Sequence, residues 1–337
     1  MSELVDRHQR PLLDLRVSVT DRCNLRCGYC MPREVFGRDY EFLPRSALLT
    51  FEEIARLCRL FAAAGVSKVR LTGGEPLLRR GLEQLVAMIA PIEGVDDLAL
   101  TTNGLALAAR AQGLRDAGLS RVTVSLDALD EGVMQQMSDT AVPLGRILEG
   151  IAAAAAAGLG PVKINMVVRR DTNEHCVESM ADYAREHGHV LRLIEYMDVG
   201  DTNDWSPAQV VPAAESLALI DRRWPLRALP PSRPGEVARR YSYLDGGGEV
   251  GVIASVTEPF CQGCTRARLS ADGRLYTCLF AGEGHDLRAL LREGRTDAEL
   301  SAHLRRVWTA RADRYSELRA RQRESGPARV EMSYIGG

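Results

Sequence analysis

Short runs of β-branched residues alternate with longer amphipathic stretches from residue 12 to residue 197. This alternation is typical of a parallel sheet whose connections cross over one face. The sequence therefore predicts an α/β fold in which six strand–helix units curve into an incomplete barrel. The predicted strands span residues 12–20, 68–72, 98–102, 121–127, 162–168 and 191–197. The predicted helices span residues 51–64, 77–90, 107–117, 144–157 and 175–187.

One face of most predicted strands is polar. In the second strand Lys68, Arg70 and Thr72 alternate with Val69 and Leu71. Parallel strands that are covered by helices are normally apolar on both faces, so a polar face predicts a wet, charged cavity inside the barrel. The sixth strand is ambiguous, because its arginine and its glutamate fall on opposite faces. The polar residues expected to face the cavity include Arg16, Lys68, Arg70, Thr101, Lys163 and Arg192.

Clustered cations of this kind need an anion, because unpaired like charges are costly to bury. A triphosphate is a suitable one, although the chain has no Walker A motif. Lys68 and Lys163 are the only lysines, which makes them candidates for positions where a compact ammonium cannot be exchanged for a guanidinium. Chance retention of these two lysines is the alternative. Internal ion pairs with Asp14, Asp127 and Glu195 are the alternative to an anionic ligand.

Three cysteines follow the first predicted strand closely, at Cys23, Cys27 and Cys30. Structural zinc almost always takes four protein ligands, and a closed iron–sulfur cluster normally takes four cysteines. Three thiolates in one loop therefore predict a cluster in which one metal ion stays open to a small molecule. Tyr29 places an aromatic ring at the rim of that site. The alternative interpretation is three unrelated buried or oxidised thiols.

A second cysteine triad lies far downstream, at Cys261, Cys264 and Cys278. It again supplies three thiolates, and no histidine stands at the spacing of a zinc finger. His285 follows Cys278 by a few residues and could complete a Cys₃His zinc site. The residues alone leave both interpretations open.

Composition bounds the class of protein. The chain has 337 residues, 45% hydrophobic content and a net charge of −2, as expected of a globular protein with no overall preference for nucleic acid. No apolar run approaches the roughly 20 residues of a membrane span, and the N-terminus lacks the apolar region of a signal peptide. Clustered cysteines in such a chain indicate metal ligands in a reducing compartment, so we expect a cytoplasmic protein. The two remaining cysteines, Cys58 and Cys176, are predicted to have no functional role.

The pattern changes near Gly200, which predicts a domain of residues 1–200 and a smaller α+β domain of residues 201–337. Residues 225–234 are rich in proline and are expected to form a connector. Strands are predicted at 241–244 and 250–256, a hairpin at 269–277 around Asp272-Gly273, and helices at 287–293 and 297–310. By composition, residues 311–329 should be disordered.

Further motifs accompany the two triads. Gly73-Gly74-Glu75-Pro76 follows the second strand, Thr265-Arg266-Ala267-Arg268 follows Cys264, and the chain ends in Gly336-Gly337. This combination resembles the GTP 3',8-cyclase family of radical S-adenosylmethionine (SAM) enzymes, which act first in molybdenum cofactor biosynthesis. The similarity extends from Asp14 to Gly337.

The resemblance implies an incomplete six-unit (β/α) barrel of the radical SAM type, and a C-terminal domain that carries a second iron–sulfur cluster. Each cysteine triad would hold a 4Fe-4S cluster. Contacts with SAM are implied for Tyr29, Gly74, Ser125 and Met197. Contacts with GTP are implied for Arg16, Lys68, Arg70, Thr101, Lys163, Arg192, Arg266, Ala267 and Arg268. Without the resemblance, Met197 is better explained as a core residue.

The family reaction uses an adenosyl radical to remove hydrogen from the ribose C3' of GTP, after which C3' attacks C8 of guanine. The product would pass to cyclic pyranopterin monophosphate synthase, and an external donor would supply electrons. The resemblance leaves room for a homodimer and implies no nucleic acid or membrane partner. It also places Gly336 and Gly337 in the active-site cavity near Arg266 and Arg268, whereas a frayed terminus is the commoner case.

Two other classes of protein compete with this interpretation. A radical enzyme that matures peptides also carries downstream clusters, but it typically has more auxiliary cysteines and needs no barrel lined with cations. A non-catalytic zinc protein would use both triads for structure or for nucleic-acid recognition. The near-neutral charge and the missing fourth ligand oppose this second alternative.

Overall fold

The strands predicted in the N-terminal half form a parallel sheet in the computed structural model, which describes residues 4–322 and 328–336. Consecutive strands are neighbours throughout, so each connection crosses back over the sheet. The structure confirms the predicted order and places the strand ends within a few residues of the prediction. The strands are β1 (Asp14–Ser18), β2 (Lys68–Thr72), β3 (Asp97–Thr102), β4 (Arg121–Ser125), β5 (Lys163–Val168) and β6 (Val190–Glu195).

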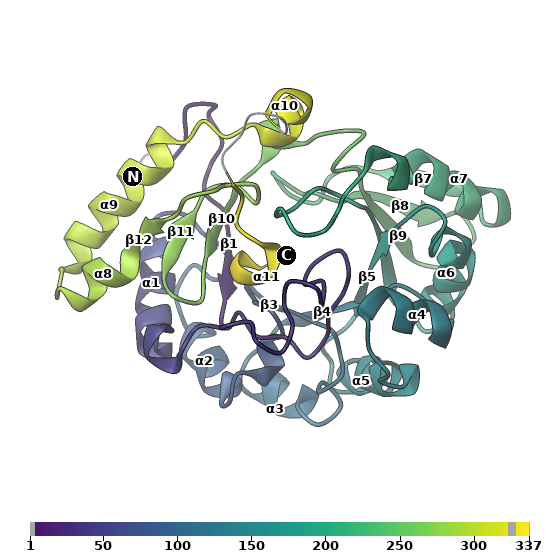
Figure 1. Cartoon of the computed structure of the whole chain (residues 1–337), viewed down its shortest axis with the longest axis horizontal. Helices are drawn as coiled ribbons and strands as arrows, with labels where there is room; N and C mark the ends of the chain where they lie inside the picture. Colours follow the sequence, from purple (N-terminus) through teal and green to yellow (C-terminus); the bar gives the residue numbers. More distant parts are fainter. Residues whose placement is uncertain (1–3, 323–327, 337) are drawn as a thin grey trace.

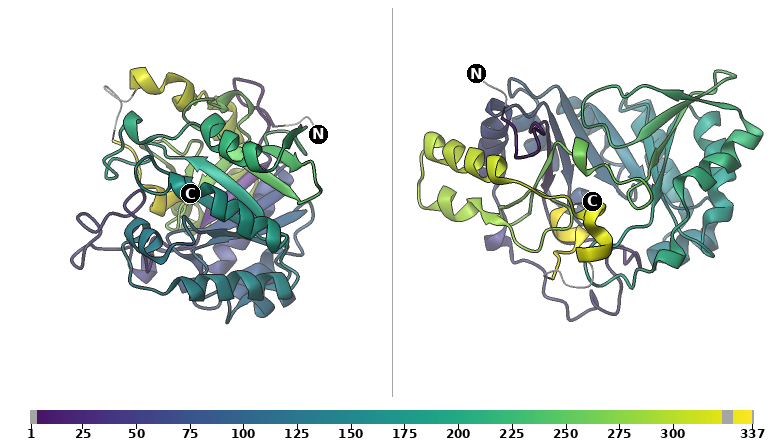
Figure 2. Two further views of the ribbon diagram at one scale, coloured as in Figure 1. Left: turned by 90° about the vertical axis from the view of Figure 1, so that its right-hand side faces the viewer. Right: turned by 90° about the horizontal axis from the view of Figure 1, so that it is seen from above.

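Helices make these crossovers and cover the outer side of the curved sheet (Figures 1 and 2). The first helix begins after Thr50, whose side chain accepts a hydrogen bond from Glu53 N while Glu53 bonds back to Thr50 N. Cys58 lies in its buried face, as predicted. The helices are α1 (Phe51–Ala63), α2 (Leu82–Ile89), α3 (Ala111–Asp116), α4 (Glu131–Ser138), α5 (Leu144–Ala156) and α6 (Val177–Glu186). The prediction missed α4.

Strands from the C-terminal half extend the sheet at both edges. They are β7 (Leu226–Leu229), β8 (Arg239–Tyr243), β9 (Glu249–Ile253), β10 (Arg266–Leu269), β11 (Arg274–Tyr276) and β12 (His285–Asp286). The complete order is β12-β11-β10-β1-β2-β3-β4-β5-β6-β9-β8-β7. Both β10 and β9 run parallel to their barrel neighbours, β1 and β6. The predicted boundary at residue 200 therefore divides the chain but not the sheet.

The remaining elements correct two expectations. The proline-rich stretch 225–234 contains β7, so it is only partly a connector. Residues 311–329 were expected to be disordered, but part of this stretch forms a helix whose Arg319 pairs with Asp198, far away in the sequence. The predicted hairpin at Asp272-Gly273 is confirmed as β10–β11. The other helices are α7 (Ala213–Arg223), α8 (Leu287–Arg292), α9 (Asp297–Ala310), α10 (Tyr315–Gln322) and α11 (Met332–Ile335).

The two faces of the sheet have different chemistry. Apolar side chains such as Leu15, Val17 and Val69 point toward the helices and belong to one continuous hydrophobic core. Burying this surface stabilises the fold by about 25 cal/mol per Å². The polar side chains of the same strands face inward, and α11 lies within the curve of the sheet (Figure 1).

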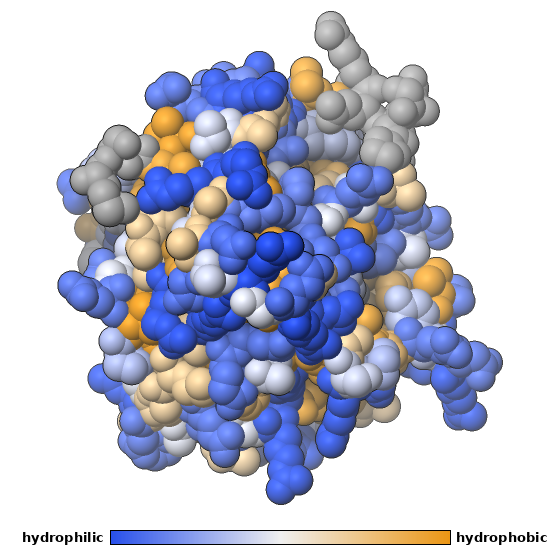
Figure 3. Space-filling model, turned by 90° about the vertical axis from the view of Figure 1, so that its left-hand side faces the viewer, coloured by the Kyte–Doolittle hydropathy of each residue, from blue (hydrophilic) through white to orange (hydrophobic). Residues whose placement is uncertain are grey.

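The outer surface is mixed in character. On the side of α8 and α9, Figure 3 shows mainly hydrophilic residues with apolar ones scattered among them. No helix in the described part of the chain is long and apolar enough to cross a membrane.

Candidate active site

One cavity on the inner side of the sheet is lined by all six cysteines of the two triads. The triads are far apart in sequence, and the curvature of the sheet brings them to the same space. The other predicted site residues that line this cavity are Arg16, Tyr29, Arg70, Gly74, Thr101, Ser125, Arg192, Met197, Arg266 and Arg268.

The first triad lies in the loop that leaves β1. Backbone turns fold this loop, with Cys30 N and Met31 N both donating to Cys27 O at 2.9 and 2.8 Å. Burial raises the pKa of Cys23 to about 11 and the pKa of Cys27 well above its ordinary value. The Tyr29 hydroxyl donates to Asp127 Oδ2 at 2.8 Å, which fixes the ring beside the cysteines.

The glycine pair after β2 packs against this cysteine loop. Gly74 N donates to Thr20 O, and Glu75 N donates to Arg22 O, both at 2.8 Å. A Cβ on Gly74 would collide with the backbone of Arg22. Glycine is thus required for the approach of the cluster loop, a reason that the sequence did not reveal. Glu75 is buried and accepts hydrogen bonds from Leu77 N, Asn103 N and the Thr102 hydroxyl.

The second triad is assembled from two separate segments. Cys261 and Cys264 lie in the turn that enters β10, and Cys278 follows β11. Arg311 Nη2 donates to Cys264 Sγ at 3.1 Å, and Arg266 Nη2 lies 3.6 Å from the same sulfur. Burial alone would raise the pKa of Cys264, but the positive charges of these two arginines lower it to about 6.

The two cysteine triads are better suited to iron–sulfur clusters than to single metal ions. Across residues 4–322 and 328–336, no three His, Cys, Asp or Glu side chains converge as ligands of one metal ion. A four-iron cluster is wider than one ion, and its cysteine ligands stand correspondingly apart. His285 is exposed on β12, where its ring packs against His303. The Cys₃His zinc alternative therefore lacks its fourth ligand.

Three cations of the predicted cluster form no direct contact with a carboxylate among the described residues, although Asp14, Asp97 and Glu236 lie near enough to act on them electrostatically. Within the described residues, the side chains of Arg16, Lys163 and Arg192 take part in no hydrogen bond or salt bridge. Burial and neighbouring arginines lower the pKa of Arg16 to about 9, and burial and the charge of Arg192 lower that of Lys163 to about 7. Such an arrangement is stabilised by a bound anion.

The side chain of Arg70 is held by hydrogen bonds to uncharged partners rather than by an ion pair with a carboxylate. Its Nη1 donates to the Thr101 hydroxyl at 2.7 Å and to the Thr123 hydroxyl at 3.1 Å. Neither partner carries charge, so the guanidinium keeps its full charge beside the cavity. Thr101 thus orients a cation and also lines the cavity itself.

Lys68 behaves differently from Lys163. Its Nζ lies 3.5 Å from Asp14 and 3.7 Å from Asp97, so the ion-pair alternative holds for this lysine. Both lysines begin their strands, β2 and β5, and neither is among the residues lining the cavity. They lie toward the amino ends of the strands, behind the cations that do line it.

The other two carboxylates of the ion-pair alternative form no ion pair among the described residues, although the charge of Arg169 acts on Asp127 from a distance. Asp127 accepts from Tyr29 and from Val167 N. Glu195 accepts from three backbone amides and from the Thr257 hydroxyl. Both stabilise loops and leave the cationic face unneutralised.

On β10 the two arginines of the Thr-Arg-Ala-Arg motif share one face. Ala267 between them is fully buried in the core beside β1, so it could meet a ligand only through its backbone. Arg266 Nε has no hydrogen-bond partner in the described structure. An arginine with a free, buried donor is prepared for an acceptor that the chain itself does not supply.

The C-terminal tail enters the curve of the sheet. Gly336 O accepts a hydrogen bond from Arg268 Nη1. Gly336 has a φ of +74°, and a Cβ there would collide with the Thr72 side chain. The Tyr334 hydroxyl donates to Asp272 Oδ1 at 2.6 Å. Gly337 lies outside the described residues.

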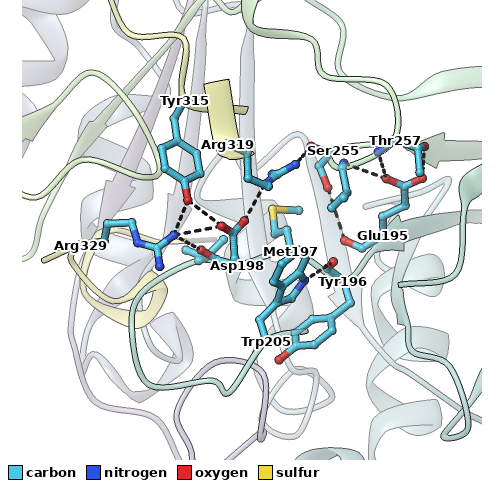
Figure 4. Close-up of polar contacts among 12 residues, drawn as sticks. Glu195, Tyr196, Met197, Asp198, Trp205, Ser255, Thr257, Tyr315, Arg319 and Arg329 are labelled. Atoms are coloured by element: carbon cyan, nitrogen blue, oxygen red, sulfur yellow. Dashed lines mark hydrogen bonds and ion pairs between the residues drawn. The ribbon is translucent and has the colours of Figure 1, made fainter. Parts of the chain in front are cut away.

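A buried carboxylate anchors the tail beside the predicted SAM contact (Figure 4). Asp198, directly after Met197, accepts from the Tyr315 hydroxyl at 2.6 Å, from Arg319 Nε at 2.8 Å and from Arg329 Nη1 at 3.1 Å. No spacing or motif in the sequence connects the members of this group, so it was not predicted.

Two stretches of the sequence match known family models. The Radical SAM superfamily model matches residues 17–184, and the model described as Molybdenum Cofactor Synthesis C matches residues 189–317. Three relatives, each named GTP 3',8-cyclase, align along nearly the whole chain. That of Acidothermus cellulolyticus is 55% identical over 97% of both chains, and that of Xanthomonas axonopodis pv. citri is 52% identical over 98% of both. That of Staphylococcus epidermidis is 45% identical over 100% of both.

The chain belongs to the GTP 3',8-cyclase family. Its fold is also that of a protein of known structure, Streptococcus suis SuiB bound to S-adenosylmethionine. That likeness has a TM-score of 0.61 at 15% identity and covers 89% of this chain and 69% of the other. At such low identity it supports the fold alone, whereas family membership rests on the full-length relatives.

Proposed function

We propose that the protein converts GTP to (8S)-3',8-cyclo-7,8-dihydroguanosine 5'-triphosphate, as its family name implies, in the first step of molybdenum cofactor biosynthesis. One observation carries the proposal, namely that both cysteine triads and a cationic face line the same cavity. A cofactor held by the first triad and a nucleotide held near the second would then lie in the same cavity.

In this proposal Cys23, Cys27 and Cys30 hold a 4Fe-4S cluster whose open iron binds SAM. When bound, the cluster and SAM together supply the 5'-deoxyadenosyl radical that removes the C3' hydrogen of GTP. The protein's part is to place SAM and exclude water. The residues proposed to contact SAM are Tyr29, Gly74, Ser125 and Met197, all of which line the cavity.

The second triad is proposed to hold a further 4Fe-4S cluster at the guanine end of the nucleotide. Arg266 and Arg268, beside it on β10, would bind guanine or phosphate oxygens. The triphosphate would compensate the buried cations, with Arg16 and Arg192 in direct contact. The further residues proposed for GTP are Lys68, Arg70, Thr101, Lys163 and the Ala267 backbone.

Several partners follow from the same proposal. The reaction needs an external one-electron donor, and its product would pass to cyclic pyranopterin monophosphate synthase. All eight cysteines are free thiols, which supports a reducing compartment, the cytoplasm.

The test is anaerobic incubation of the reconstituted protein with GTP, SAM and a reductant, followed by mass analysis. We expect 5'-deoxyadenosine and a product isomeric with GTP in equal amounts. The matched control is Cys27→Ser, which should form neither. Cleavage of SAM by the parent protein without any conversion of GTP would contradict the proposal and favour another radical SAM substrate, such as a peptide.

A further inference from the structure

A buried arginine lies behind the second triad. Arg311, between α9 and α10, has a side chain only 1% exposed. Its Nη2 donates to Cys264 Sγ at 3.1 Å, while its Nη1 donates to Cys264 O at 2.8 Å. Among the described residues, Arg311 and Arg266 are the arginines that donate to a cysteine sulfur. Arg266 has a proposed role with GTP, but Arg311 has no role in the function proposed above.

The N-terminal segment holds this arginine in place. Asp6 Oδ2 accepts from Arg311 Nη1 at 3.2 Å, and the Asp6 side chain is 0% exposed. Asp313 Oδ2 lies 3.5 Å from Arg311 Nε. The Trp308 ring lies under the guanidinium, 4.5 Å from its carbon. With carboxylates and an aromatic face around it, Arg311 cannot turn away from Cys264.

Arg10 provides an internal comparison. It is also buried, and its Nε donates to the same Asp6 Oδ2 at 2.6 Å. Its Nη1 donates to Cys261 O at 2.7 Å and to Asp313 O at 2.8 Å. Arg10 therefore contacts the backbone of one cysteine of the triad, and Arg311 contacts the backbone and the sulfur of another. The difference between the two arginines is the sulfur contact.

We propose that Arg311 is a positioning residue of the second cluster, which holds the Cys264 thiolate by a hydrogen bond and makes the cluster easier to reduce. The inference rests on the second cluster of the proposed function. A hydrogen bond from a cation withdraws electron density from the sulfur, and reduction adds negative charge that the cation stabilises. Arginine suits this position because its planar fork spans the carboxylate, the carbonyl and the sulfur at once.

The experiment isolates the second cluster. In the full chain, Cys23→Ser, Cys27→Ser and Cys30→Ser together remove the first cluster, and iron, sulfide and the electron paramagnetic resonance signal then report on the second alone. In this background we compare two double variants, Arg311→Gln with Asp6→Asn and Arg10→Gln with Asp6→Asn. Asp6→Asn is common to both variants because Asp6 pairs with both arginines, so the comparison differs only in which arginine loses its charge.

We expect both variants to keep the cluster, and the midpoint potential to become more negative in the Arg311 variant than in the Arg10 variant. Loss of the cluster in the Arg311 variant alone would also support the positioning role. Equal potentials, or loss of the cluster in both variants, would show that the network is only structural. A parent background that assembles no cluster would overturn the second cluster itself, and the role of Arg311 would fall with it.

Discussion

The two cysteine triads line one cavity but are built in different ways. The first is contained in one loop after β1, and no arginine in the described structure donates to its sulfurs. The second is gathered from the two ends of the β10–β11 hairpin and lies beside Arg266 and Arg311. Burial raises the pKa of Cys23 to about 11, whereas at Cys264 the arginines overcome burial and lower the pKa to about 6.

Because of this difference, the two ends of the cavity have opposite charge, with carboxylates at one end and cations at the other. Buried carboxylates, Glu75 and Asp127, accompany the first triad, and burial raises the pKa of Asp127 to about 6. Cations from β1, β2 and β10 accompany the second. A cationic sulfonium ligand suits the first end, and a nucleotide triphosphate suits the second. In the proposed function, the charge of the ligand would therefore distinguish the two ends of the cavity, in addition to the metal chemistry.

The largest expected effect comes from the cysteines themselves. Cys27→Ser should abolish SAM cleavage, because it removes a ligand from a site that already has one position open. Cys264→Ser should leave the first cluster intact and still abolish cyclisation. Iron content, spectra and product analysis of the two variants measure this. If the Cys264 variant cyclised GTP normally, the second triad would not be needed for the reaction, and the two ends of the cavity would not have the separate roles proposed for them.

We expect the C-terminal tail to affect only the step that takes place at the cationic end of the cavity, which is cyclisation. Gly336→Ala places a Cβ against Thr72 and displaces the carbonyl from Arg268, so we expect cyclisation to fall roughly 100-fold while SAM cleavage continues. Gly294→Ala is the matched control, because this glycine also has positive φ, +77°, but nothing lies near its missing Cβ. Equal losses in the two variants would indicate backbone strain rather than displacement of the tail.

A smaller effect is expected where the tail meets the SAM contact. Asp198→Asn removes a buried charge from three donors and should cost about 3 kcal/mol of local stability. Hydrogen exchange in residues 328–336 should then speed up, and SAM cleavage should become uncoupled from cyclisation. The exposed Asp201 also pairs with Arg329, and Asp201→Asn is the control, with little expected change. Unchanged exchange in the Asp198 variant would show that the tail is held elsewhere.

The smallest expected effect is a difference in GTP affinity between variants of the two lysines. Lys163→Ala should weaken GTP binding roughly 10-fold, because it removes one positive charge from behind the cavity, and leave guanosine binding unchanged. Lys68→Ala should have less effect, because Asp14 and Asp97 already compensate this lysine. Lys163→Arg should restore the affinity only in part. Titration calorimetry with GTP and guanosine would measure these differences. If the parent and both alanine variants bound GTP with equal affinity, neither lysine would have a role in binding and both would have been retained by chance.

The pH dependence of the same binding provides a sharper check. Burial lowers the pKa of Lys163 from 10.5 to about 7, so the free protein loses this charge as the pH rises through neutrality. A bound phosphate favours the charged form, and GTP affinity should therefore fall between pH 6 and pH 8.5. Lys163→Arg should flatten this dependence. An identical pH profile in that variant would assign the titration to another group.

Much of the fold was predictable, because periodicity is a local property. The strands β1 to β6, the helix α1 and the β10–β11 hairpin follow from alternation, helical spacing and an Asp-Gly turn. The errors lie where distant partners decide. Residues 315–322 were expected to be disordered by composition, yet they form a helix because Tyr315 and Arg319 reach Asp198 from far along the chain.

By itself the sequence determined the local chemistry of this protein, namely a triad of thiols after a strand, a glycine pair after the next strand, and arginines that alternate on one face. These features depend on residue spacing and backbone geometry within a few residues. Only the tertiary structure decided that both triads share one cavity, that Lys68 is paired while Lys163 is not, and that Asp6 directs Arg311 at Cys264. Charge–charge energies depend on distance and burial, and neither is fixed until the chain is folded.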